Sequence, residues 1–120
     1  MKILIVDDSK TMRMIVARTL KRTNLGDHTV VEASDGQEAL KVVEEASPDV
    51  VLSDWNMPEM NGLELLQQLR ENGNQVNFGF VTSESTSDMR EQATAAGAAF
   101  FVTKPFTPES LEEALSPVLA

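Results

Sequence analysis

One carboxylate, Asp54, stands where an apolar run gives way to a turn. The run Val50 to Leu52 is too short for a helix and apolar throughout, which is typical of a strand covered on both faces. Asn56 and Pro58 then end it. Open α/β sheets bind their ligands at the carboxyl ends of such strands. Asp54 is therefore a candidate reactive group, although an aspartate at this place could equally serve only to cap the turn.

Other apolar runs end in side chains that complement this carboxylate. Asp7 and Asp8 follow the first run, Thr82 closes another, and Lys104 follows the last. Three carboxylates in one pocket repel one another, so a cation must join them or some must be protonated. Magnesium fits, because it prefers carboxylate and water ligands and accepts a phosphate oxygen. A transferred phosphoryl group needs a nucleophile, a metal and donors, which Asp54, the carboxylates, Lys104 and Thr82 would supply as a group, with an acyl phosphate as product.

Each of these residues also has an ordinary structural explanation. Asp7 and Asp8 could cap the first helix. Lys104 could be a solvated surface lysine, and Thr82 could bond its local backbone. The joint site is favoured only if the elements bring all of them to one place.

Strands and helices are predicted to alternate along the whole chain. The expected strands are Ile3 to Val6, Val30 to Ala33, Val50 to Leu52, Phe78 to Thr82 and Ala99 to Thr103, each followed by a helix. Repeated right-handed βαβ units give a doubly wound α/β fold, a parallel sheet with helices on both faces. In such a sheet every strand's carboxyl end opens onto the same edge, which places Asp7, Asp8, Asp54, Thr82 and Lys104 together.

The helices carry signals of their own. Asp35 and Glu38 have the spacing of a capping box, and Thr107 is expected to cap the last helix, which Pro117 should kink or stop. One face of the first helix is predicted to consist of Met12, Ile15, Val16, Thr19 and Leu20.

Composition sets the class of protein. The 120 residues, 42% of them hydrophobic, suit one domain with one core. The net charge of −9 argues against a nucleic-acid partner, and no segment resembles a signal peptide or a membrane span. Cysteine is absent, which excludes disulfides and agrees with a reducing compartment. We expect a cytoplasmic protein with no membrane association.

Over essentially its whole length the chain resembles the receiver domain of two-component response regulators, and within that family the stand-alone chemotaxis regulators. The most specific matches are the stretch from Ser53 to Leu66 and the stretch Lys104 to Thr107. The resemblance implies a flavodoxin-like fold with five parallel strands in the order 2-1-3-4-5 and five helices. It also implies one receiver domain over residues 1–120 without an output domain.

The resemblance assigns a role to each site residue. Asp54 would be the phosphoacceptor of a histidine kinase or small phosphodonor, with probable loss of the group by autodephosphorylation and no enzyme activity on a separate substrate. Mg²⁺ would be held by Asp8, Asp54 and the carbonyl of Asn56, with Asp7 contacting it through water. Lys104 would bind the phosphoryl group, and its peptide bond to Pro105 would be cis.

Further positions would transmit or tune the signal. Thr82 would move towards the phosphoryl group, and Phe101 would turn inward beside it, changing a protein-binding surface. Trp55 is expected to be exposed at the rim of the site, although packing against a helix is equally plausible. Asn56 and Glu84 would govern the access of hydrolytic water. The partners would be the kinase and a phosphorylation-dependent protein target, and the unphosphorylated chain would be a monomer.

Other functions fit less well. A phosphate sink, which drains a kinase shared with another regulator, would need the same residues. A small phosphatase of the haloacid dehalogenase type needs an Asp-x-Asp motif after the first strand and cap segments, which are missing. A flavin binder would need a loop that accepts phosphate where Asp7 and Asp8 would repel it. A flagellar motor target is doubtful, because Ser83 to Ser87 contains no lysine and Ala114 carries no charge.

Overall fold

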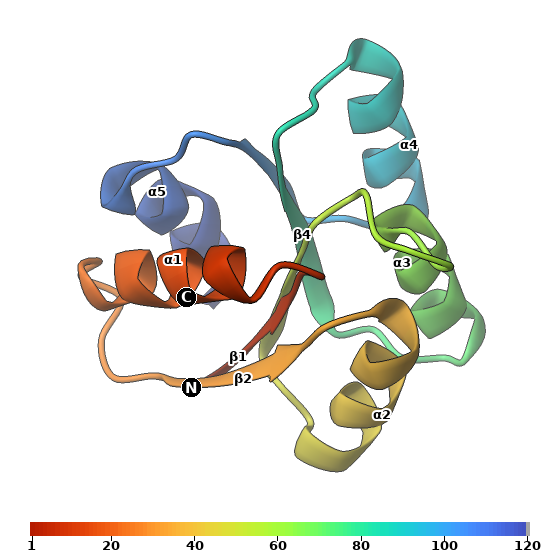
Figure 1. Ribbon diagram of the computed structural model, residues 1–120, viewed down its shortest axis with the longest axis horizontal. Helices are drawn as coiled ribbons and strands as arrows, with labels where there is room; N and C mark the ends of the chain where they lie inside the picture. Colours follow the sequence, from red (N-terminus) through yellow and green to blue (C-terminus); the bar gives the residue numbers. More distant parts are fainter. Residues whose placement is uncertain (120) are drawn as a thin grey trace.

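Five strands and five helices alternate without exception in the computed structural model, which describes residues 1–119 (Figure 1). The strands are β1 (Lys2–Val6), β2 (Thr29–Ala33), β3 (Val50–Ser53), β4 (Asn77–Thr82) and β5 (Phe100–Thr103). The helices are α1 (Lys10–Lys21), α2 (Gly36–Ala46), α3 (Gly62–Glu71), α4 (Ser87–Ala96) and α5 (Pro108–Leu119).

The strands form one parallel sheet in the order β2-β1-β3-β4-β5, which confirms the predicted topology. Figure 1 shows α1 and α5 on one face of this sheet and α2, α3 and α4 on the other. Two apolar clusters fill the layers between helices and sheet, one on each face. The central strands β1 and β3 are buried on both faces from Ile3 to Val6 and from Val50 to Ser53, because helices cover both faces, and all of these residues but Ser53 are apolar.

The predicted face of the first helix is wrong at Ile15, and Pro117 does not end the last helix. Ile15 is 42% exposed, because α1 turns Val16 and Leu20 to the sheet instead, where they belong to the same buried cluster as Leu111 of α5. Pro117 does not stop α5, which continues to Leu119. Proline at this position removes only the one hydrogen bond that its N–H would have donated to the carbonyl four residues earlier, and the rest of the helix before it is unaffected.

The edge of the sheet opposite the carboxyl ends brings the two ends of the described chain together. Met1 and Leu119 line one hollow of about 390 Å³ with Asp49 and Asn77. The Met1 carbonyl accepts a 2.7 Å hydrogen bond from the N–H of Thr29, which ties the start of the chain to β2. No helix within residues 1–119 combines the length and the hydropathy needed to cross a membrane.

Candidate functional site

Backbone hydrogen bonds extend the sheet one residue past its strands and fix the predicted site residues. The Asp54 N–H donates to the Val6 carbonyl over 2.9 Å, and the Lys104 N–H donates to the Thr82 carbonyl over 2.8 Å. The hydrogen bonds of the sheet therefore hold the backbone of both residues in place, although both lie in loops just beyond the strands. The coincidence expected from the sequence is confirmed, because neighbouring strands deliver these side chains to one edge.

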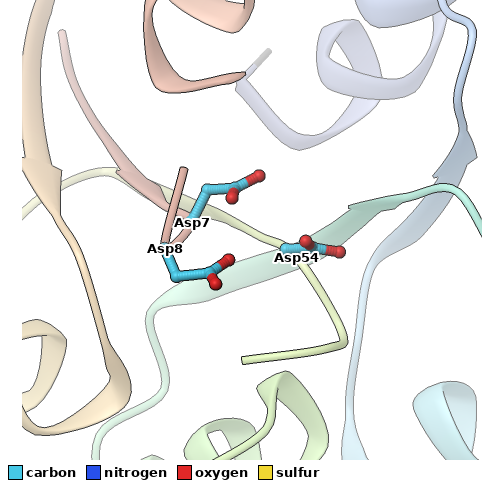
Figure 2. A group of neighbouring side chains, drawn as sticks. All are labelled: Asp7, Asp8 and Asp54. Atoms are coloured by element: carbon cyan, nitrogen blue, oxygen red, sulfur yellow. The ribbon is translucent and has the colours of Figure 1, made fainter. Parts of the chain in front are cut away.

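Three carboxylates converge at this edge. One oxygen from each of Asp7, Asp8 and Asp54 lies within 4.8 Å of the other two, and Figure 2 shows the side chains leaving the ends of β1 and β3. Asp7 is buried, Asp54 is half-buried and Asp8 is exposed. Burial raises the pKa of Asp7, and the nearby charge of Asp54 raises it further, against the opposing effects of the Ser9 N–H and Lys104.

Lys104 is the cation that faces this cluster. Its Nζ lies 3.5 Å from Oδ2 of Asp7 and 3.7 Å from Oδ2 of Asp54, and its side chain is only 15% exposed. The Lys104 to Pro105 peptide bond is cis, as predicted. Lys104 is thus part of the site and not a solvated surface lysine. One lysine opposite three carboxylates leaves an excess of negative charge, and oxygen ligands are what a hard divalent cation prefers. These residues could hold a metal ion.

Neither Asp7 nor Asp8 caps the first helix. Ser9 is the N-cap of α1, and its hydroxyl accepts a hydrogen bond from the Met12 N–H. Asp7 instead accepts the Ser9 N–H over 2.9 Å, which orients its buried carboxylate. The helix-capping explanation is therefore wrong for both aspartates.

Arg13 supports the site from α1, and nothing in its sequence context indicates this. Its guanidinium donates to the backbone carbonyl of Asp7 over 2.6 Å and to the Glu32 carboxylate over 2.8 Å. These contacts join α1, the end of β1 and β2. The backbone that presents Asp7 and Asp8 is thereby fixed from the side opposite β3.

Thr82 is fully buried, and its hydroxyl has no hydrogen-bond partner within residues 1–119. The expectation that it might bond the local backbone is therefore wrong. An unpaired buried hydroxyl is unfavourable and calls for an explanation. Its position at the end of β4, between β3 with Asp54 and β5 with Lys104, places it at the functional edge.

The expectation of an exposed Trp55 at the site rim is wrong. Trp55 is 8% exposed and packs on Phe80, with ring centroids 4.9 Å apart, and its centroid lies 6.2 Å from that of Phe101. The order β3-β4-β5 explains this, because it places Phe80 and Phe101 side by side next to the residue that follows Asp54. The alternative, that Trp55 packs against a helix, is right that the side chain is buried, but its main aromatic partner is Phe80 of the sheet.

Asn56 and Glu84 are exposed and meet across the site. The Asn56 side-chain nitrogen donates to Oε1 of Glu84 over 3.2 Å, which links the loop after β3 to the loop after β4. Asn56 also lines, with Asp8, an open hollow of about 480 Å³. The two residues therefore do stand at the rim of the site, on its solvent side.

Gly62 is a further site residue that the sequence analysis missed. A Cβ at this position would lie 2.2 Å from the Asp54 carbonyl and 2.8 Å from the Phe80 ring. Only glycine lets the start of α3 approach the backbone that carries Asp54 so closely. The Gly62 N–H donates to the Trp55 carbonyl over 2.8 Å, which closes the loop.

Comparison with known proteins gives consistent matches. Residues 3–116 match the family of the response regulator receiver domain. The chain is 42% identical to the chemotaxis protein CheY1 of Helicobacter pylori, over 99% of this chain and 97% of that protein. It is also 42% identical to a CheY homolog of Campylobacter jejuni, over 99% and 92%. The solved structure of CheY4 of Vibrio cholerae superposes with a TM-score of 0.86 at 35% identity, over 98% of this chain and 97% of that one.

Proposed function

The chain belongs to the response regulator receiver family, and from that premise we propose that it is a single-domain regulator in which Asp54 accepts a phosphoryl group from a histidine kinase. Membership makes it a phosphoacceptor and not an enzyme that turns over a separate substrate. The observation that carries the proposal is the half-buried Asp54 carboxylate, faced by Lys104 and flanked by two more carboxylates. A single domain agrees with the match to CheY1 over 97% of that protein.

Mg²⁺ is the cofactor we propose. The carboxylates of Asp7, Asp8 and Asp54 and the backbone carbonyl of Asn56 would hold it, Asp7 through water. The clustering of three carboxylates around one lysine, with the raised pKa of the buried Asp7, supports a divalent cation at this place. When bound, such an ion supplies positive charge to the oxygens of the transferred group.

The chain's own residues divide the remaining work. The Oδ1 atom of Asp54 accepts the Trp55 N–H over 2.8 Å, so Oδ2, on the side of Lys104, is the oxygen that we assign as nucleophile. A bond forms from Oδ2 to phosphorus while the bond from phosphorus to the donor nitrogen breaks, and the imidazole leaves. Lys104 then exchanges its contact with the carboxylate for one with the phosphoryl oxygen.

Thr82 and Phe101 form the proposed switch. The Thr82 hydroxyl has no partner in the described chain, so a new acceptor on Asp54 would give it a hydrogen bond that it lacks. Movement of Thr82 would open space for the half-buried Phe101 ring to turn inward. The surface made by α4, β5 and α5 would change with it and bind the protein target, in chemotaxis-like or other two-component signalling.

Asn56 and Glu84 are proposed to set the phosphoryl lifetime. Their hydrogen bond crosses the open side of the site, where a hydrolytic water must enter.

Helix α1 is proposed to receive the phosphodonor. The segment 10–22 carries five cations and no acid in a chain of net charge −9, and the side chains of Met14 and Ile15 are 43% and 42% exposed on it. An acidic partner with an apolar centre would fit this surface beside Asp8.

The test is the intact mass after incubation with a small phosphodonor, with and without Mg²⁺. Wild type should gain one phosphoryl group only when Mg²⁺ is present, and Asp54→Asn should gain none. Asp27→Asn, which changes an exposed aspartate away from the sheet's functional edge, is the matched control and should behave as wild type. A wild type without adduct from both small donors and a histidine kinase would refute the proposal. An adduct on Asp54→Asn would refute the assigned acceptor.

A further inference from the structure

Arg90 of α4 joins three segments of the proposed switch with one guanidinium. Its Nε donates to the Ser85 hydroxyl over 2.8 Å, and its Nη2 donates to the Thr103 hydroxyl over 3.1 Å. Its Cζ atom lies 4.8 Å from the centroid of the Phe101 ring. This distance is within the range of a cation–π contact. Although Arg90 is exposed, all of its partners are neutral, and within residues 1–119 no carboxylate forms an ion pair with it.

The positions of these partners give the contact its meaning. Ser85 lies in the loop that follows Thr82, and Thr103 is the last residue of β5, directly before Lys104. Thr82 and Thr103 are register partners across β4 and β5. Because β4 lies between β3 and β5, a shift of Thr82 towards Asp54 carries the loop that follows Thr82 away from Thr103. The two hydrogen bonds of Arg90 join that loop to Thr103 and oppose the separation.

We propose that Arg90 is a latch, a positioning residue that holds the loop after β4 and the Phe101 ring in the unphosphorylated arrangement. The proposal rests on the proposed phosphoswitch and adds a residue that opposes it. A planar guanidinium bonds two separated hydroxyls from different nitrogens while its flat face covers a ring, whereas a lysine carries all its donors on one compact nitrogen. The latch must open for Phe101 to turn inward, because the ring is held from its outer side.

Linkage gives the latch a measurable consequence. A contact made only in the unphosphorylated arrangement lowers the population of the active arrangement and must be broken when the phosphoryl group is added. Removing it should therefore favour the active arrangement about three- to tenfold, the range expected for one exposed charged contact. Phosphorylation of Asp54 by a small donor should accelerate by a similar factor if the active arrangement is the one that reacts.

The experiment uses Trp55, the chain's single tryptophan, as reporter. Its ring centroid lies 6.2 Å from that of Phe101, so its emission responds to the position of that ring. Emission of Arg90→Met without phosphodonor should differ from wild type, in the direction that wild type shows on phosphorylation. Arg90→Lys keeps the charge but loses the separate nitrogens that reach Ser85 and Thr103 and the flat face on Phe101, and should behave like Arg90→Met.

Lys41→Met is the matched control, because it removes one exposed cation from α2, which packs on β1 and β2 away from β4 and β5. Its emission and rate should equal those of wild type. The latch is refuted if Arg90→Met matches wild type in emission and rate, or if Arg90→Lys retains wild-type behaviour while Arg90→Met does not. Equal emission of unphosphorylated Arg90→Met and wild type refutes the hold of Arg90 on the Phe101 ring whether or not wild type takes an adduct. A missing adduct would refute the phosphoacceptor and leave the contact between Arg90 and Phe101 judged separately.

Discussion

Replacing Thr82 by valine should stabilise the fold and disable the switch together. The substitution keeps the shape of the side chain and removes a hydroxyl that is fully buried and has no partner in residues 1–119. Mutational data place the penalty for burying an unpaired polar group at about 1–3 kcal/mol. We therefore expect Thr82→Val to raise the free energy of unfolding by about 1–2 kcal/mol, where most core substitutions lower it.

For a chain of this length, about 1 kcal/mol corresponds to a shift of about 4 °C in Tm, so the gain should be about 4–8 °C. Urea unfolding measures the free energy of unfolding itself, and Trp55 fluorescence can follow it because the indole is buried in the native state. Thr82→Val should still accept a phosphoryl group on Asp54. Its Trp55 emission should no longer change when it does, because valine cannot bond the phosphoryl oxygen.

Thr82→Ser is the control, since it keeps the hydroxyl and loses the methyl group. It should be less stable than wild type by about 1 kcal/mol through lost apolar contact. If Thr82→Val is no more stable than wild type, the hydroxyl has a favourable partner in the resting protein, and the reasoning about an unpaired group is wrong. If its emission still changes on phosphorylation, Thr82 is not the link to Phe101.

Three further predictions concern the frame around the site. Burial raises the folded-state pKa of Asp7, so the ionised carboxylate lowers the stability of the fold above that pKa, and this loss is absent below the ordinary value of 3.8. Asp7→Asn should therefore raise the free energy of unfolding near pH 7 without metal, and the gain should fade towards pH 4. A pH series of urea titrations in chelator measures this, and a gain that grew on acidification would contradict it. Gly62→Ala should lower stability by about 2–3 kcal/mol, because its Cβ would meet the Asp54 carbonyl; an unchanged urea midpoint would show that the loop can yield. Ser47, exposed after α2, has a φ of 46°, so Ser47→Gly should raise Tm by about 2–4 °C, and a lower Tm by calorimetry would count against strain there.

The edge-directed residues could be predicted because strand ends are local signals. Asp54 and Lys104 each come two residues after an apolar run, and parallel strands bring their carboxyl ends to one edge of the sheet. The N-terminus of α3 carries an equally local signal, because Asn61 and Glu64 have capping-box spacing and form a complete capping box. At Asp35 and Glu38 only half of the predicted box forms, because the Glu38 carboxylate bonds the Ser34 hydroxyl instead.

The features that were predicted wrongly or missed depend on contacts between elements that are distant in the sequence. Trp55 lies among polar neighbours in the sequence, and only the adjacency of β4 and β5 supplies the rings that bury it. The wrong assignment of Ile15 has the same origin, since α5 decides which face of α1 is covered. The role of Arg90 needs the register that sets Thr103 beside Thr82. No local pattern could have indicated it.

The proposed site and the two ends of the described chain lie at opposite edges of the sheet. The proposed phosphoacceptor site lies at the edge with Asp54, whereas Met1 and Leu119 share a hollow at the other edge. A fluorescent tag, a surface anchor or a second domain joined at either end would therefore begin on the side away from the carboxylates. Joining the two ends through a short linker would likewise leave β1 and β3 intact. The domain can therefore be fused or immobilised through either end, and the edge that carries the three carboxylates stays accessible to partners.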